Sequence, residues 1–150
     1  MTDGQMLFYG RFEYALDERG RLPLPPRFRE ALQEGAVLSQ DFPHLCLLLY
    51  SREAFRQEAA QVTAVPRMHR RGRLLRWGLL STSFDVELDK QSRVLIPPSL
   101  REYAGLSTKA LVVGDGECLQ IWSPESFADV WAGARAELQA AQESYEPRER

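Results

Sequence analysis

The chain has 150 residues, of which 44% are hydrophobic and 27% charged, and its formal net charge is −2. This composition is ordinary for a globular protein and excludes an intrinsically disordered one. The sequence has no run of the ~20 apolar residues that a membrane helix needs, and its first residues lack the pattern of a secretory signal. We therefore expect a cytoplasmic protein that has no contact with a membrane.

Residues 7–55 predict a series of short elements. Alternating apolar and polar residues indicate a strand at 7–16, and Asp17 and Gly20 are typical of a tight turn. Proline at 25 and 26 ends the following strand and can open a helix. The expected elements are, in order, strands at 7–16 and 21–24, a helix from Arg27 to about Gln33 closed by Gly35, strands at 36–38 and 45–50, and a helix capped by Ser51.

The same series then recurs. The segment 16–30 matches the segment 88–102 in Leu, Asp, Arg, Pro, Pro, Arg and Glu, at an offset of 88 − 16 = 72 residues. The same offset relates Cys46 to Cys118 and Phe55 to Phe127. We therefore divide the chain into a first unit at 7–55, a helical linker at 56–81, a second unit at 82–127, and a C-terminal helix with a polar tail at 128–150.

One unit alone is too small to cover the edges of its strands. Two units can cover them by interleaving. The expected fold is therefore α+β: a pseudo-twofold β-barrel made from two tandem repeats, with short peripheral helices.

The repeated motif Asp-x-x-x-Arg spans each turn, from Asp17 to Arg21 and from Asp89 to Arg93. Two interpretations are open. In the first, the aspartate and arginine only clamp a hairpin. In the second, the turns present arginine and lysine to a DNA groove, and each aspartate holds its arginine in one rotamer, because arginine can donate two hydrogen bonds to guanine. The presented cations would be Arg19, Arg21, Lys90 and Arg93.

The sequence contains no combination of residues typical of an enzyme. His44 and His69 have no metal-ligand or nucleophile spacing around them, and Cys46 and Cys118 lie in apolar strands where a buried thiol is expected. No phosphate-binding or nucleophile motif is present. We expect no enzymatic activity, cofactor, metal or small-molecule substrate.

Positive charge is concentrated in the middle of the chain. Residues 65–101 carry eight basic and three acidic side chains, a net of 8 − 3 = +5, whereas residues 102–150 carry four and nine, a net of 4 − 9 = −5. Five of the arginines, at 67, 70, 71, 73 and 76, fall in a predicted helix of the linker. This helix is either a solvated face beside an inter-subunit contact or a second strip that contacts phosphates.

The two turns and their surroundings resemble the MraZ family of bacterial regulators, which are built from two AbrB/SpoVT-like units. The resemblance rests on residues 8–10, 16–21, 25, 28–29 and 46–50 in the first unit and on 86–93, 96–101 and 104–106 in the second. It implies a double-psi or swapped-hairpin type barrel, a ring-shaped homo-oligomer, and binding to direct repeats in the promoter of the division and cell-wall gene cluster.

The resemblance also implies which residues contact DNA and where the protein acts. The family's DNA-contacting motif falls on Asp17 and Arg21 and on Asp89 and Arg93, and its members act as nucleoid-associated repressors. Ser92 stands where the family usually has glycine; if the turn requires a positive φ, serine costs on the order of 1 kcal/mol and can change the loop. The alternative function is a ring-forming assembly protein that uses its turns for protein contacts.

Overall fold

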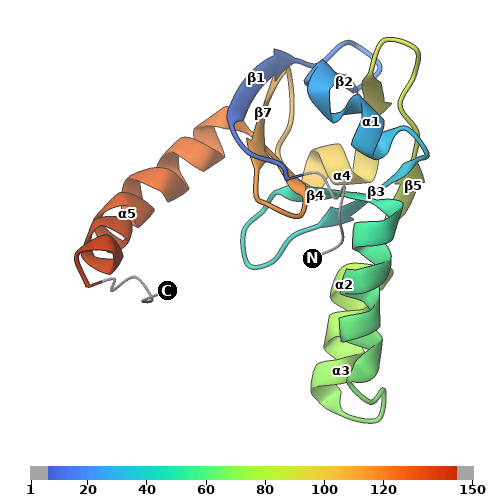
Figure 1. Cartoon of the computed structure of the whole chain (residues 1–150), viewed down its shortest axis with the longest axis vertical. Coiled ribbons are helices and arrows are strands. Elements are labelled where there is room, and N and C mark those ends of the chain that lie inside the picture. Colours follow the sequence, from blue (N-terminus) through green and yellow to red (C-terminus); the bar gives the residue numbers. More distant parts are fainter. Residues whose placement is uncertain (1–6, 145–150) are drawn as a thin grey trace, which may run out of the picture.

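The computed structural model describes residues 7–144, so the end of the predicted polar tail lies outside the described residues (Figure 1). The strands are β1 (Arg11–Ala15), β2 (Arg21–Pro23), β3 (Ala36–Gln40), β4 (Leu47–Ser51), β5 (Phe84–Val86), β6 (Arg93–Leu95), β7 (Lys109–Gly114) and β8 (Leu119–Trp122). The helical elements are η1 (Pro26–Phe28), α1 (Arg29–Leu32), α2 (Arg52–Ala64), α3 (Arg70–Leu75), η2 (Arg76–Leu80), α4 (Pro98–Tyr103) and α5 (Pro124–Glu143).

Strands from the two halves of the chain share two antiparallel sheets. The larger sheet has the order β1-β7-β8-β4-β3-β5, and β2 pairs with β6 in the smaller one. The first strand of each half therefore joins the other half: β1 pairs with β7, and β5 pairs with β3. This agrees with the predicted α+β fold of interleaved repeats, whereas closure of the sheets into a barrel stays a prediction.

The strand registers define a pseudo-twofold axis. Leu48 pairs with Gln120 and Leu22 with Val94, and both pairs are separated by the repeat offset, 120 − 48 = 72 and 94 − 22 = 72. An axis through these two pairs exchanges the two halves of the chain.

The offset of 72 does not extend to β3 and β7. Phe12 pairs with Val112 and its equivalent Phe84 pairs with Leu38, so the offset between these strands is 112 − 38 = 74. The cause is a pair of compensating loop lengths: the loop before these strands runs over residues 33–35 in the first half and 104–108 in the second, and the loop after them over 41–46 and 115–118.

The core is formed by both halves together. Phe28 is 1% exposed and its ring meets those of Phe8 and Phe12 edge-on, with centroids 4.9 and 6.0 Å apart. Leu100, its equivalent at 28 + 72, is also 1% exposed. The short helical elements η1 and α4 are not stable by themselves. Burial of Phe28 and Leu100 in the core holds them in place.

Two predicted elements have different limits in the structure. The strand expected at 7–16 begins only at Arg11, because Gly10 has a φ of +98° and Phe8 forms an isolated bridge with Gly116. The first-unit helix is split into η1 and the single-turn α1. The predicted helix cap at Ser51 is confirmed: its hydroxyl accepts from the Ala54 N–H at 3.1 Å at the start of α2.

Two helical segments extend from the sheets in different directions (Figure 1). The linker folds back as a hairpin of α2 and α3, in which Gly72 lies against the Pro66 carbonyl where a β-carbon would collide. Arg76 donates to the carbonyls of Thr63 and Val65 at 3.2 and 3.3 Å and so caps the end of α2. Over residues 7–144, no helix is long and apolar enough to cross a bilayer.

Candidate nucleic-acid interface

The two Asp-x-x-x-Arg turns lie next to each other. Each connects an outer strand to a strand of the smaller sheet, β1 to β2 and β5 to β6, and this sheet is only three residues long. Both turns lie at the end of the molecule opposite to the α2–α3 hairpin (Figure 1). We call these turns the first loop (residues 17–21) and the second loop (residues 89–93).

In the first loop, one carboxylate organises the backbone and the arginine together. Asp17 Oδ1 accepts from the N–H groups of Arg19 and Arg21 at 3.0 and 2.9 Å. Its Oδ2 accepts from Arg21 Nε at 2.5 Å. Because Arg21 uses its Nε edge here, the guanidinium is held in one orientation.

The second loop repeats this geometry. Asp89 Oδ1 accepts from the N–H groups of Gln91 and Arg93 at 2.9 and 3.0 Å, and its Oδ2 accepts from Arg93 Nε at 2.8 Å. Ser92 has a φ of +61°, where Gly20 of the first loop has +85°. The serine therefore adopts the left-handed conformation and the loop keeps the same hydrogen bonds.

Each loop is held by residues from the other half of the chain. Arg93 Nη1 lies 3.7 Å from Asp17 Oδ2, which joins the two loops directly. The Leu24 N–H donates to the Ser92 carbonyl at 3.0 Å, and the Ile96 N–H donates to the Gly20 carbonyl at 2.9 Å. The pair of loops is therefore one rigid unit.

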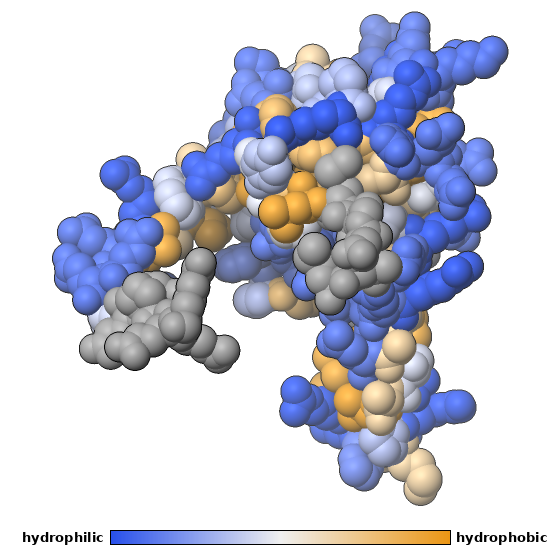
Figure 2. All heavy atoms as spheres, viewed as in Figure 1, coloured by the Kyte–Doolittle hydropathy of each residue, from blue (hydrophilic) through white to orange (hydrophobic). Residues whose placement is uncertain are grey.

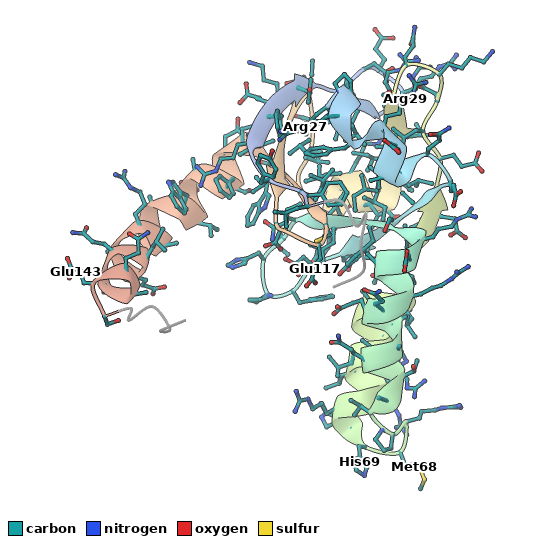
Figure 3. The ribbon with its side chains drawn as sticks, in the orientation of Figure 1. Arg27, Arg29, Met68, His69, Glu117 and Glu143 are labelled. Carbon is teal, nitrogen blue, oxygen red and sulfur yellow. The ribbon has the colours of Figure 1, made fainter. Side chains whose placement is uncertain are left out.

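Two further arginines that the motif did not predict lie at this site. Arg29 Nη2 donates to the Lys90 carbonyl at 3.0 Å, and Figure 3 shows Arg29 at the loop end of the molecule. Arg101 covers Gly20 so closely that a β-carbon there would lie 2.6 Å from its Nε. The two are related by 101 − 29 = 72, so the repeat itself was the signal that could have identified them.

The cations differ in exposure. Arg19 and Lys90 are exposed and, within residues 7–144, form no ion pair. The side chains of Arg21 and Arg93 are 33% and 25% exposed, next to their aspartates. The site thus presents two free cations around two fixed guanidinium groups, a pattern suited to an anionic, structured ligand.

The aspartates act as anionic braces. The backbone N–H of Arg21, followed by its side chain and by the N–H of Arg19, lowers the pKa of Asp17 below its usual 3.8. The N–H groups of Arg93 and Gln91 and the Arg93 side chain lower the pKa of Asp89 in the same way. The hydrogen bonds of each carboxylate to backbone N–H groups of its own loop make the motif aspartates turn caps.

The lowered pKa values of Asp17 and Asp89 predict that part of the free energy of unfolding is lost at acid pH. A carboxyl whose pKa is lower in the folded chain stabilises the fold above its unfolded pKa, and this contribution is lost as the pH falls through the folded pKa. We expect the double variant Asp17→Asn/Asp89→Asn to lose less stability than the native chain between about pH 5 and pH 3. Urea unfolding at a series of pH values measures this; parallel curves for both proteins would contradict it.

The positive φ of Ser92 predicts a stabilising substitution. A left-handed conformation costs a non-glycine residue about 1–2 kcal/mol, and the extra chain entropy of glycine offsets about half of that. We expect Ser92→Gly to raise the free energy of unfolding by about 0.5–1 kcal/mol. The reverse change, Gly20→Ser, should destabilise, because it adds both strain and the collision with Arg101. Thermal unfolding compares the two; a less stable Ser92→Gly would contradict the argument.

The remaining candidates for chemistry are structural. Cys46 and Cys118 are 0% and 6% exposed, as predicted, and burial raises the pKa of both thiols, that of Cys118 to about 12. His44 is exposed in a loop. Among residues 7–144, no group of three or more potential metal ligands comes together.

Comparisons with known proteins agree with the repeat. The family model described as "MraZ protein, putative antitoxin-like" matches twice, at residues 7–76 and 79–146. The chain is 40% identical over 136 residues, 91% of its length and 92% of the relative's, to a protein of Thermomicrobium roseum named "Transcriptional regulator MraZ". It is 39% identical over 124 residues, 83% and 86% of the two lengths, to a protein of the same name from Roseiflexus castenholzii.

Proposed function

Since the chain belongs to the MraZ family, we propose that it is a transcriptional regulator that binds double-stranded DNA through its two aspartate-braced loops. The DNA contacts are assigned to Asp17, Arg19 and Arg21 of the first loop and to Asp89, Lys90 and Arg93 of the second, with the aspartates as positioning residues. The family's members are named as regulators and not as enzymes, in line with the absence of a catalytic motif in the sequence.

The observation that carries this proposal is the pairing of two equivalent loops in one rigid unit. Each guanidinium is fixed through Nε, and Arg93 Nη1 also faces Asp17 Oδ2 at 3.7 Å, so that the other Nη groups remain for a base or a phosphate. An exposed cation stands beside each fixed arginine, Arg19 in one loop and Lys90 in the other. Such a cluster can combine sequence readout with phosphate contacts.

The finer parts of the proposal follow from the family. The regulator acts as a repressor of the division and cell-wall gene cluster and binds direct repeats in its promoter. It does so in the cytoplasm, associated with the nucleoid, as a ring-shaped homo-oligomer of subunits with the pseudo-twofold barrel. One subunit binds weakly, and a ring that spans spaced repeats raises the effective concentration of the remaining loops.

A footprint on the DNA upstream of this protein's own gene, made with the purified chain, tests the proposal. We expect protected segments at regular spacing. A salt titration follows: binding through several arginines should weaken by about 10³-fold or more between 50 and 200 mM salt. No protection of this DNA, or an affinity that salt hardly changes, would contradict the proposal and favour the assembly protein that uses its loops for protein contacts.

A further inference from the structure

An apolar groove lies between the α2–α3 hairpin and the sheet. Its volume is about 820 Å³, and its floor and walls include Leu48, Tyr50, Leu74, Leu75 and Leu79. Leu74 and Leu75 remain 46% and 38% exposed. Apolar residues are visible at the surface of this hairpin in Figure 2. So much exposed apolar surface in one groove is typical of a binding site for a protein segment.

The α3 side of this groove is basic, because Arg70 and Arg71 line it, whereas Asp41 and Glu58 line its other parts. The segment 65–81 has five arginines and no acidic residue, a net of +5. Arg76 is used inside the hairpin, where it caps α2, whereas Arg67, Arg70, Arg71 and Arg73 are exposed. An occupant of the groove should therefore be apolar on one side and acidic where it faces α3.

Helix α5 has these properties. Its stripe of apolar residues runs along one face at helical spacing, over Phe127, Trp131, Ala134, Leu138 and Ala141. The helix carries Glu125, Asp129, Glu137 and Glu143 against Arg135 alone, a net of 1 − 4 = −3, and its outer half from residue 135 has a net of 1 − 2 = −1. The charges of helix and groove are thus complementary.

Only the first half of α5 is held by its own subunit. Arg11 stacks on the rings of Phe127 and Trp131, with its guanidinium carbon 4.8 and 4.3 Å from their centroids. From residue 135 to 144 every residue is exposed, and Leu138 is 44% exposed. Figure 3 shows the end of the helix, at Glu143, far from the sheets.

We propose that the outer half of α5 of one subunit lies in the α2–α3 groove of the next copy of this chain. This inference rests on the proposed function in one respect: it states how neighbouring subunits of the proposed ring contact each other. Because helix and groove lie on different parts of the subunit (Figure 1), the contact is heterologous, so that repeated copies close into a ring or form a filament. The loops, at the end of the subunit opposite to the hairpin, stay outside the contact.

Two matched pairs of variants test this contact. Leu138→Glu places a charge in the apolar stripe, whereas Ala136→Glu places the same charge on the opposite side of the helix. Leu74→Glu changes the groove, whereas Gln61→Glu changes an exposed position of α2. Light scattering after size exclusion should show a loss of the oligomer for Leu138→Glu and Leu74→Glu and an unchanged mass for the two controls. Circular dichroism confirms that all four fold.

A cross-link locates the contact. A mixture of the single variants Leu138→Cys and Leu75→Cys, treated with a short thiol cross-linker, should give a covalent dimer that neither variant gives alone. A monomeric native chain, no mixed dimer, or an unchanged mass of Leu138→Glu and Leu74→Glu would overturn the proposal. If Leu74→Glu keeps the oligomer and only weakens DNA binding, the groove arginines form a phosphate-contacting strip and the proposal is again overturned.

The DNA-binding proposal is separable from this one. In the Leu138→Glu variant, affinity for DNA with a single repeat should stay within about twofold of the native value, whereas affinity for several repeats should fall by about 10²-fold as the effective concentration is lost. Loss of single-repeat binding in Leu138→Glu would contradict the separation of the two surfaces. Unchanged multi-repeat binding by a monomeric variant would show that the contact plays no part in DNA binding.

Discussion

The double variant Arg21→Ala/Arg93→Ala is expected to lose specific binding to its promoter DNA. An arginine that bonds a guanine through both donors contributes about 1–3 kcal/mol of discrimination. Removing one such arginine from each loop of a subunit takes away about 2–6 kcal/mol and should weaken binding by about 30-fold at least, since about 1.4 kcal/mol is tenfold. A mobility-shift titration at fixed salt measures the loss.

A control and a conservative change make this result specific. Arg56→Ala removes an exposed arginine of α2, away from the loops, and should leave the affinity within about twofold, while light scattering should show the native mass for all variants. Arg21→Lys keeps the charge without the planar fork. It should retain most of the non-specific binding and lose preference for the promoter sequence if Arg21 reads a base. Equal affinities for the native chain and the double alanine variant would refute the assignment.

The first-loop aspartate could be predicted because its role is local. An aspartate that begins a tight turn four residues before an arginine bonds the backbone within that turn, and the repeat showed that the chain uses this turn twice. The same local reasoning found the Ser51 cap and the burial of Cys46. In each case, the residues that determine the structure lie within a few positions of each other.

The contacts between the two halves could not be predicted in this way. The two-residue shift between β3 and β7 depends on the lengths of the loops before and after these strands, and no pattern within a strand reports it. The position of Arg29 against Lys90 depends on how the halves interleave. Arg76 was counted among the cations of a basic strip, but the hairpin turns it onto the end of α2.

The substitution Phe28→Ala should cause the largest loss of stability. Phe28 is 1% exposed and meets both Phe8 and Phe12, so its removal leaves a cavity and costs about 3–5 kcal/mol of the free energy of unfolding. In a chain of this length, the melting temperature should fall by about 6–20 °C. Phe84→Ala provides the control, because Phe84 is 42% exposed and should cost about 1 kcal/mol. Calorimetry compares the two variants, and equal shifts would show that the aromatic cluster around Phe28 adds no more stability than a half-exposed side chain.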